Sequence, residues 1–443
     1  MPDRPAVGGE GAALDYRGLA ARAAAIAGSL RERWRLPPGE RVMLCMENCA
    51  EFFEALFGCW AAGLCAVPVN AKLHPKEVAY IAENSGARLL LATQGLAAKL
   101  AGVAASAPSL AAVVATGTSD YATLLAGREV APHESAPGDA AWLFFTSGTT
   151  GRPKGAVLSH RALLFMSHAY YADIDFVDER DTMLHAAPLS HGSGLYALPH
   201  LLKGGQQVVL AGSFEPDRVF EAIAHYPNVS FFAAPTMVSR LVNAGGAARA
   251  DLRNLKTIAY GGGPMYVADL KRALALFGPR LYQLYGQGES PMTITGLAKP
   301  LHAAADHPRD EALLASCGYP RTGVLVKVVG ADDRELPFGE VGEVVTRSDC
   351  VMTEYFGNAA ATAETMRGGW LHTGDLGAMA ADGLLTLRDR SKDLIISGGS
   401  NIYPREIEEV LLRHAQVQEV SVVGAPHGDW GEEVVAFIVP KPG

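Results

Sequence analysis

The stretch "FFTSGTTGRPKG", residues 144–155, decides how this sequence is interpreted. Four hydroxyl side chains and three glycines crowd into it, and Lys154 follows a proline near its end. It continues an apolar run, residues 140–145, that predicts a buried strand. Glycines let backbone N–H groups turn toward an anion, hydroxyls donate further hydrogen bonds, and lysine adds a charge that phosphate binds well. The stretch therefore predicts an anion-binding loop at the end of a strand.

Two other interpretations of this loop compete with that one. The P-loop pattern G-x-x-x-x-G-K-[ST] fails on spacing, because Pro153 and Ala156 stand where its second glycine would be and Lys154 precedes another glycine. A flexible surface linker is the other alternative. A linker, however, needs neither a lysine behind a proline nor a strand that leads into it.

Size and composition limit the classes of protein that this sequence can encode. A chain of 443 residues exceeds one compact core, so we expect two or three domains. The net charge is −9 without a run of Lys and Arg, which argues against partners such as nucleic acid or an anionic membrane surface. No apolar run approaches the roughly 20 residues of a membrane span, and the first residues do not resemble a secretory signal.

The cysteines indicate the redox environment. Six occur, none in a C-x-x-C pair, and the first four lie in apolar surroundings. This pattern favours buried, reduced thiols over disulfides, and a zinc site would need more closely spaced ligands. We therefore expect a cytoplasmic protein.

Helical periodicity and short apolar runs alternate along most of the chain. One helical face runs through residues 15–33, with Asp15 as its N-cap. Before the loop, further helices are expected at 50–63 and 75–84, and strands at 41–46, 65–70, 88–92 and 111–115. After the loop, helices are expected at 160–171, 195–203, 216–225, 236–243 and 265–276, and strands at 182–187, 206–210, 229–234, 256–260 and 280–285. Such alternation predicts parallel sheets covered on both faces, and the two blocks predict two of them.

The remainder of the chain has a different character. Short strands with Gly- and Pro-containing turns predict a β-rich subdomain at about 316–389. Helix and strand mix again in residues 390–443. We therefore expect an α/β protein. Its large N-terminal domain, residues 1–389, would hold two parallel-type, helix-layered sheets and the β-rich subdomain, and residues 390–443 would form a partial small α+β C-terminal domain.

Five motifs occur together in this sequence. The loop lies in "FTSGTTGRPKGAVLSH" (145–160), and later come "LYGQGES" (284–290), "GEVVTRSDCVMTEYFGN" (342–358), "GWLHTGDLG" (369–377) and "RDRSKDLIISGGSNIYPREIEEVL" (388–411). In order and spacing they resemble the adenylate-forming superfamily of acyl- and aryl-CoA synthetases (AMP-forming), peptide-synthetase adenylation domains and luciferases. The resemblance extends from residue 15 to residue 443. It implies ATP-dependent conversion of a carboxylic acid to acyl-AMP and pyrophosphate, and then displacement of AMP by a thiol, usually that of coenzyme A.

The resemblance also implies a nucleotide site. Its residues for the ATP phosphates are Thr146, Ser147, Gly148, Thr149, Thr150, Gly151 and Lys154. Tyr285 would lie beside the adenine, Gly261, Gly262 and Gly263 would lie against the adenine and the acyl pocket, and Gly286 and Gln287 would also contact ATP or AMP. Asp375 would bind both ribose hydroxyls, and Arg390 would make a second ribose or phosphate contact. Glu289 would hold Mg²⁺, which binds oxygen ligands and needs little more than one carboxylate and the phosphates. His191, Lys154 and Glu289 are the expected catalytic residues.

An acyl pocket is expected beside this site. By resemblance it is lined by His191, Gly192, Tyr196, Pro235, Thr236, Gly263 and Met292. These residues are small, apolar or neutral, which favours a neutral aliphatic or aromatic monocarboxylic acid. Peptide-synthetase domains commonly carry an aspartate next to the position of His191, and this chain has none there. A dicarboxylic acid is disfavoured as well, unless Arg240 or Lys271 reaches the pocket.

The C-terminal motif implies a moving domain. Lys392 matches the hinge about which that domain turns between the two half-reactions, and Gly398 and Gly399 match the strand along the coenzyme A tunnel.

Two features depart from the family pattern. Gly288 stands where the family usually places a threonine that contacts the α-phosphate. The family's adenylation lysine would follow the last residue given, so we expect this chain to bind ATP, AMP or acyl-adenylate while forming the adenylate slowly.

Three alternatives remain beside the acyl-CoA synthetase. They are a peptide-synthetase-type adenylation unit, a non-catalytic nucleotide-binding module and a light-emitting oxidase. A homodimer is also possible.

Overall fold

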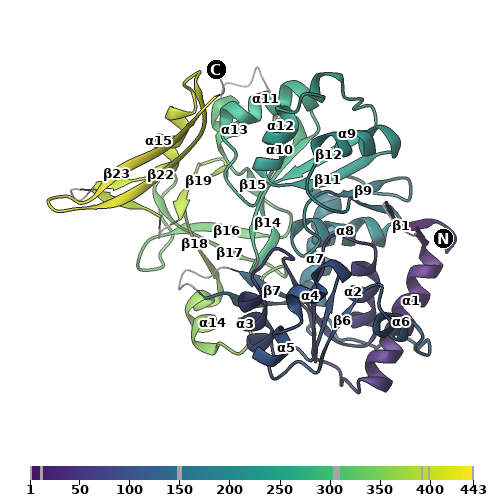
Figure 1. Ribbon diagram of the computed structural model, residues 1–443. Helices are drawn as coiled ribbons and strands as arrows, with labels where there is room; N and C mark the ends of the chain where they lie inside the picture. The colour runs from purple at the N-terminus through teal and green to yellow at the C-terminus, as the bar shows by residue number, and fades with distance from the viewer. Residues whose placement is uncertain are drawn as a thin grey trace.

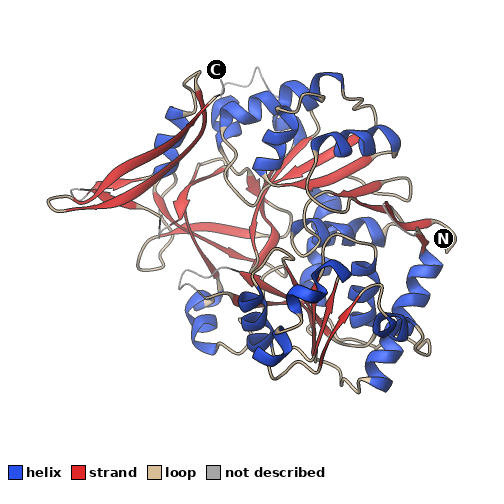
Figure 2. Ribbon diagram, in the orientation of Figure 1, coloured by secondary structure: helices blue, strands red, loops and turns tan. Residues whose placement is uncertain are grey.

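The computed structural model describes residues 2–9, 13–146, 152–302, 310–390, 393–397 and 400–441, and at residue 390 the backbone only. In these residues two large mixed sheets with helices form the body of the molecule (Figures 1 and 2). A four-stranded antiparallel sheet lies beside them, and a second four-stranded sheet with a long hairpin projects from the body near the C-terminus. The expected α/β fold is confirmed.

The first large sheet has six strands in the order β6-β5-β3-β4-β7-β8. Its neighbours pair in parallel, except that β7 and β8 form an antiparallel hairpin. The central strands β3, β4 and β5 are buried almost throughout, as strands covered on both faces must be. The strands are β3 (Arg41–Cys45), β4 (Cys65–Val69), β5 (Leu89–Ala92), β6 (Ala112–Ala115), β7 (Ala140–Thr146) and β8 (Lys154–Ser159). The helices of this part are α1 (Tyr16–Gly28), α2 (Glu51–Ala61), α3 (Pro75–Ser85), α4 (Ala97–Leu100), α5 (Val103–Ser106) and α6 (Ser119–Leu125).

The second large sheet has nine strands in the order β15-β14-β13-β12-β11-β9-β10-β1-β2. Pairing is parallel from β13 through to β1 and antiparallel at both edges. The strands are β1 (Pro5–Gly9), β2 (Leu14–Asp15), β9 (Thr182–His185), β10 (Gln206–Val209), β11 (Val229–Ala233), β12 (Leu255–Tyr260), β13 (Leu281–Gln287), β14 (Ser290–Leu297) and β15 (Tyr319–Pro320). The helices of this part are α7 (His160–Asp173), α8 (Gly192–Leu202), α9 (Pro216–His225), α10 (Pro235–Val242), α11 (Val267–Phe277), α12 (Lys299–His302) and α13 (Asp310–Ala315).

One hydrophobic core joins the two large sheets. Phe52 and Trp142 of the first part belong to the same buried cluster as Met183 and Tyr196 of the second. Local capping fixes where the connecting helices begin. Ser159 accepts a hydrogen bond from the backbone of α7, and Asp15 caps α1 in the same way, as the sequence predicted.

The antiparallel sheet contains β16 (Leu325–Val329), β17 (Val341–Arg347), β18 (Leu371–Met379) and β19 (Leu385–Arg390), with α14 (Ala359–Thr365) beside it. The β18–β19 hairpin places the backbone of Arg390 opposite Asp375. The projecting part contains β20 (Ile395–Ser397), β21 (Ser400–Ile402), α15 (Pro404–Leu411), β22 (Val417–His427) and β23 (Gly431–Pro440).

Among the strands of the two large sheets that have more than two residues, β1, β8 and β14 escaped prediction from the sequence. The strand β1 has only three buried residues between exposed ends, and it is held by parallel pairing to β10 about 200 residues away. The strands β8 and β14 each form an antiparallel hairpin with the preceding strand, without a helix between. The sequence predicted parallel sheets, and these two antiparallel hairpins correct that prediction.

The cysteine side chains lie mostly in the protein interior. All six cysteines are free, and five of them are buried. Burial raises the pKa of the Cys45 thiol to about 12, so it stays protonated at neutral pH. Among the described residues, no helix combines the length and apolar character that crossing a bilayer requires.

Candidate active site

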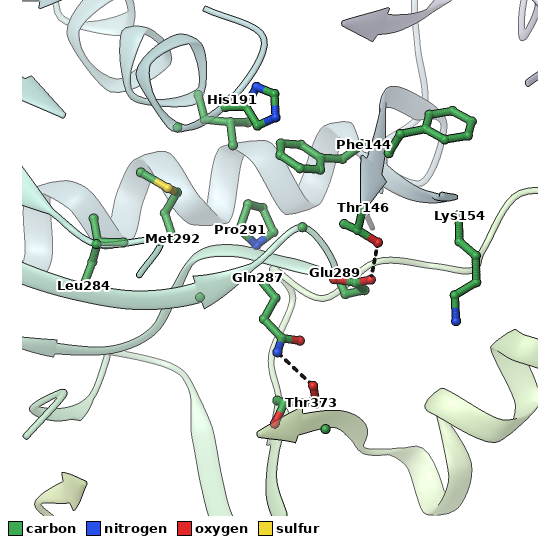
Figure 3. A pocket seen from close by; sticks show the side chains of 18 of the residues that line it. Phe144, Thr146, Lys154, His191, Leu284, Gln287, Glu289, Pro291, Met292 and Thr373 are labelled. Carbon is green, nitrogen blue, oxygen red and sulfur yellow. Dashed lines mark hydrogen bonds between the residues drawn. The ribbon is translucent and has the colours of Figure 1, made fainter. Parts of the chain in front are cut away.

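A cavity of about 710 Å³ lies where the two large sheets meet the antiparallel sheet. It collects residues from the ends of β7, β12 and β13, the start of α8 and the turn before β18. Figure 3 shows this cavity with its labelled side chains. Ten of the expected site residues line it: Thr146, Lys154, His191, Gly192, Gly261, Gly262, Gly286, Gln287, Glu289 and Met292.

Glu289 lies in the turn between β13 and β14 and is nearly buried. Its Oε1 atom accepts a hydrogen bond from the Thr146 hydroxyl at 2.8 Å and a second from the Tyr355 hydroxyl at 2.7 Å. Burial and the nearby carboxylate raise the pKa of Tyr355, which therefore remains a donor. Among the described residues, both hydrogen bonds to this carboxylate end on Oε1. The Oε2 atom is therefore available as a ligand for the cavity that Glu289 lines.

Asp375 lies on β18 across the cavity from that turn, and it is 6% exposed. The Tyr285 hydroxyl donates to its Oδ2 atom at 2.6 Å, and Gln287 Nε2 donates to the same atom at 2.7 Å. Gln287 Nε2 also donates to the carbonyl of Thr373 at 2.8 Å, which joins β13 to β18 (Figure 3). Burial, and then Asp375, raise the pKa of Tyr285 well above its usual value, so its hydroxyl stays protonated and donates. Together the two donors hold the aspartate in one orientation.

His191 precedes the first turn of α8 and points toward the cavity (Figure 3). Its Nδ1 atom lies 2.8 Å from the Ser190 hydroxyl, and its ring meets Phe144 edge to face at 5.5 Å between centroids. Burial lowers the pKa of His191, which favours the neutral imidazole at physiological pH. A neutral ring at a helix N-terminus suits contact with a carboxylate that is losing its charge.

Family comparison gives the same assignment as this geometry. Residues 1–356 match the family described as AMP-binding enzyme, and residues 406–443 match the AMP-binding enzyme C-terminal domain. The chain belongs to the AMP-binding enzyme family. The resemblance inferred from the motifs is thereby confirmed.

Named relatives of this AMP-binding enzyme are ligases. It is 36% identical to the fatty acid–[acyl-carrier-protein] ligase ScoC of Streptomyces coeruleorubidus, over 100% of this chain and 85% of that protein. It is 35% identical to a feruloyl-CoA synthase of an Amycolatopsis species, over 100% of this chain and 87% of that protein. Its fold matches ATP-bound MatB from Rhodopseudomonas palustris with a TM-score of 0.90 at 27% identity, covering 99% and 86% of the two chains. The expected AMP-forming acid–thiol ligase, with ATP, a carboxylic acid and coenzyme A as substrates, is confirmed at the level of the family.

Several expected pocket residues of this AMP-binding enzyme do not line the cavity. On α8, Gly192 and Leu195 face the cavity, whereas Tyr196 points into the core. At the start of α10, Ala234 and Met237 take the places expected of Pro235 and Thr236. Helical phase explains both differences, because residues three apart share a face and the next residue is turned away. Gly263 and the buried Tyr285 and Asp375 are likewise absent from the lining.

The cations proposed for a second carboxylate lie elsewhere. Arg240 donates to the carbonyl of Phe214, and Lys271 pairs with Glu311 on the surface. Neither lines the cavity.

The glycine at the family's threonine position has a steric cause. A Cβ atom at residue 288 would lie 2.2 Å from Thr146 Cγ2 and 2.7 Å from Phe144 Cδ1. Such contacts are far inside van der Waals distance, so a threonine there requires the side chains of Thr146 and Phe144 to shift. Gly288 therefore lets Thr146 reach Glu289 across the sheet junction.

Two residues near the cavity, Tyr355 and Arg321, had no role predicted from the sequence. Tyr355 lies in a motif that the sequence analysis used only for recognition, and it contacts Glu289 directly. Arg321 is buried behind Met292, which lines the cavity. It pairs with Asp173 at 3.0 Å and donates to the carbonyl of Met292 at 2.9 Å. An arginine between apolar strands, "GYPRTG" (318–323), was the available signal.

Several expected residues lie outside the described parts of the chain. They are Ser147, Gly148, Thr149, Thr150, Gly151, Lys392, Gly398 and Gly399, and for Arg390 only the backbone is described.

Proposed function

We propose that this chain binds ATP in the cavity, activates a neutral aliphatic or aromatic monocarboxylic acid as its acyl-adenylate and transfers the acyl group to coenzyme A. One observation carries the proposal. Glu289 lines one cavity together with Lys154 and His191, and a second nearly buried carboxylate, Asp375, lies directly behind the lining residue Gln287, which donates to it. Each carboxylate also accepts a hydrogen bond from a tyrosine hydroxyl. Buried carboxylates with fixed donors are arranged for ligands, because isolated burial would only destabilise them.

The nucleotide would span the two carboxylates. Asp375 would accept hydrogen bonds from the ribose hydroxyls, and the backbone beside Gly261 and Gly262 would lie against the adenine, where a side chain would obstruct it. Thr146 and Lys154 flank the loop, residues 147–151, that would hold the phosphates. The ammonium group of Lys154 would offset the negative charge that gathers on the phosphoryl oxygens in the transition state.

Mg²⁺ fits the residues at Glu289. The described residues contain no cluster of three metal-ligating side chains, so a fully protein-bound metal is not supported there. A single carboxylate on the cavity wall matches the way Mg²⁺ is bound with phosphate oxygens and waters. Bound there, the ion would neutralise charge on the phosphates, while Glu289 would fix its place.

The acyl group would lie toward Phe232, Leu284 and Met292. The cations that line the cavity are Lys154, on the side of Glu289, and Arg367, which is paired with Asp333 and Glu343. No cation therefore faces the apolar side among the described lining residues, which supports a neutral acid. His191 would orient the carboxylate without adding a charge.

The remaining parts of the proposal rest on the motifs. Lys392 would be the hinge between residues 1–389 and 390–443, and Gly398 and Gly399 would lie along the path of the pantetheine thiol. A homodimer also stays a prediction, which sedimentation at micromolar protein would test.

Binding measurements test the proposal most directly. Titration calorimetry with ATP, AMP and non-hydrolysable acyl-adenylate analogues should detect all three in the wild-type chain. Asp375→Asn should weaken AMP roughly tenfold or more, because a charged acceptor is replaced by a neutral amide. Asp251→Asn, an exposed aspartate remote from the cavity lining, is the matched control.

The second half-reaction identifies the acceptor and the acid. Synthetic acyl-AMP compounds are supplied with coenzyme A, and acyl-CoA is measured by mass spectrometry. We expect turnover of hexanoyl- and benzoyl-AMP and little turnover of a carboxylate-terminated acyl-AMP. Nucleotide binding that Asp375→Asn leaves unchanged would refute the assignment of the site. Binding without acyl transfer would favour the non-catalytic module.

A further inference from the structure

A short segment after β17, residues 352–356, connects the two sides of the phosphate end of the cavity. Its backbone pairs with β8, since Thr353 N donates to Val157 O at 2.9 Å and Val157 N donates to Glu354 O at 2.9 Å. At its other end Met352 N donates to the carbonyl of Glu289 at 2.7 Å. The segment therefore pairs with β8, the strand that begins at Lys154, and also holds the β13–β14 turn by a backbone hydrogen bond.

Tyr355 occupies the centre of this segment and contacts both candidate phosphate-site residues. Its hydroxyl donates to Glu289 Oε1 at 2.7 Å, and the Lys154 ammonium lies over its ring, 4.4 Å from the centroid. The side chain is 5% exposed and lines the cavity. Its backbone is paired with Ala156 of β8, which anchors the residue to the strand that carries Lys154.

These contacts act on charge and on orientation. The hydroxyl is one of two donors to Oε1, and with Thr146 it fixes which Glu289 oxygen faces the cavity. The ring face attracts an ammonium ion, so it restrains the flexible Lys154 side chain near the same point. A single rigid side chain thus sets the distance between a carboxylate and a cation.

We propose that Tyr355 is a positioning residue that aligns the Glu289 carboxylate and the Lys154 ammonium for a metal-bound triphosphate. It acts through its hydroxyl on the carboxylate and through its ring on the cation. The inference deepens the proposed function and rests on it. Its hydrogen bond to Glu289 and its ring contact with Lys154 both lie at the proposed phosphate end, so we expect its effect on the phosphates and their metal.

The two halves of the side chain can be removed separately. Tyr355→Phe deletes the hydroxyl and keeps the ring, whereas Tyr355→Leu deletes both. Affinities for ATP with Mg²⁺, ATP with EDTA and AMP are measured by titration calorimetry. Mn²⁺ binding to the ATP complex is followed separately by electron paramagnetic resonance, which reads the metal without turnover.

We expect Tyr355→Phe to weaken Mg²⁺–ATP and Mn²⁺ binding about tenfold, the effect of losing one hydrogen bond to a charged group. ATP without metal and AMP should bind as in the wild type. Tyr355→Leu should in addition weaken metal-free ATP about threefold, since Lys154 loses its ring contact. AMP should still bind normally, because it lacks the phosphates that Lys154 would meet.

A matched pair elsewhere in the chain serves as the control. Tyr121 donates to the buried Glu54 at 3.1 Å, far from the cavity lining. Tyr121→Phe removes the same kind of bond and should lower thermal stability without changing any nucleotide or metal constant. This separates positioning from a general loss of packing.

The outcomes distinguish the inference from the function beneath it. If the wild type fails to bind ATP, the proposed function is wrong. If it binds ATP and Tyr355→Phe changes metal-dependent and AMP binding equally, or changes neither, the positioning role is wrong and the function stands. Should Tyr355→Leu not fold, the comparison of Tyr355→Phe with Tyr121→Phe still decides the matter.

Discussion

Gly288→Ala tests whether close packing, and not backbone conformation, requires glycine in the β13–β14 turn. The φ angle of Gly288 is not positive, so alanine is compatible with the backbone. The added methyl group would lie 2.2 Å from Thr146 Cγ2 and 2.7 Å from Phe144 Cδ1. The side chains of Thr146 and Phe144, or the turn itself, must therefore shift, and we expect the Thr146–Glu289 hydrogen bond to stretch first.

The magnitude follows from these two effects. Overpacking of this kind costs about 2 kcal/mol, and loss of a hydrogen bond to a carboxylate adds about 1.5 kcal/mol. We therefore expect Gly288→Ala to destabilise the chain by about 3.5 kcal/mol in urea unfolding followed by tryptophan fluorescence. Mg²⁺–ATP affinity should fall about tenfold, because Glu289 loses one of its two described donors.

A second substitution makes the reasoning refutable. Thr146→Ser removes the Cγ2 atom and keeps the hydroxyl that donates to Glu289, so it should recover part of the loss in the Gly288→Ala background. Recovery should be incomplete because the Phe144 contact remains. The reasoning fails if Gly288→Ala unfolds at the wild-type urea midpoint, or if the double variant is no more stable than Gly288→Ala alone.

Other perturbations give equally direct tests. Arg321→Met should destabilise the chain by about 3 kcal/mol, because it leaves the Asp173 carboxylate beside the core without its cation. Arg367 is half exposed, so Arg367→Met should change stability by less than about 1 kcal/mol. Equal losses in urea unfolding would contradict this. Met292 has a φ of 62°, so Met292→Gly should be more stable than Met292→Ala by about 1 kcal/mol, and both should improve binding of bulky over small acyl-adenylate analogues in calorimetry. Stability should fall as pH falls below about 6.5, by roughly 1.4 kcal/mol per pH unit for each histidine that is buried neutral and charges on unfolding. A urea midpoint that is flat from pH 6.5 to 5 would contradict that assignment. These histidines are His185, His200 and His302, and burial lowers their pKa values to about 4, about 3 and about 4 respectively.

The sequence indicated which segments meet at the candidate site more accurately than it indicated which side chains line the cavity. The loop motif, Glu289 and Asp375 were identified from motifs because hydroxyls, glycines and carboxylates at fixed spacing reflect what a nucleotide needs locally. Tyr196 and Thr236 were placed in the acyl pocket for their positions in the chain, and helical phase turned both away. A motif fixes which segment reaches the site, but only packing fixes which face of a helix is presented.

Long-range pairing escaped the sequence for a related reason. Apolar periodicity predicts helices and buried strands without specifying which strands pair. Most strands of both large sheets could therefore be predicted. The strand β1, the contact of Tyr355 with Glu289 and the burial of Arg321 depend on segments far apart in the chain. No local pattern encodes such contacts.

The sequence by itself determined the α/β class, the nucleotide-handling motifs and the absence of an acidic group beside His191, because these depend on residue type and short spacing. Only the tertiary structure decided that Gly288 must be glycine, that Tyr355 joins Glu289 to Lys154, and which side chains border the acyl group. Each of those depends on two surfaces meeting at van der Waals distance, and that distance is set by the whole packed core and not by any one segment.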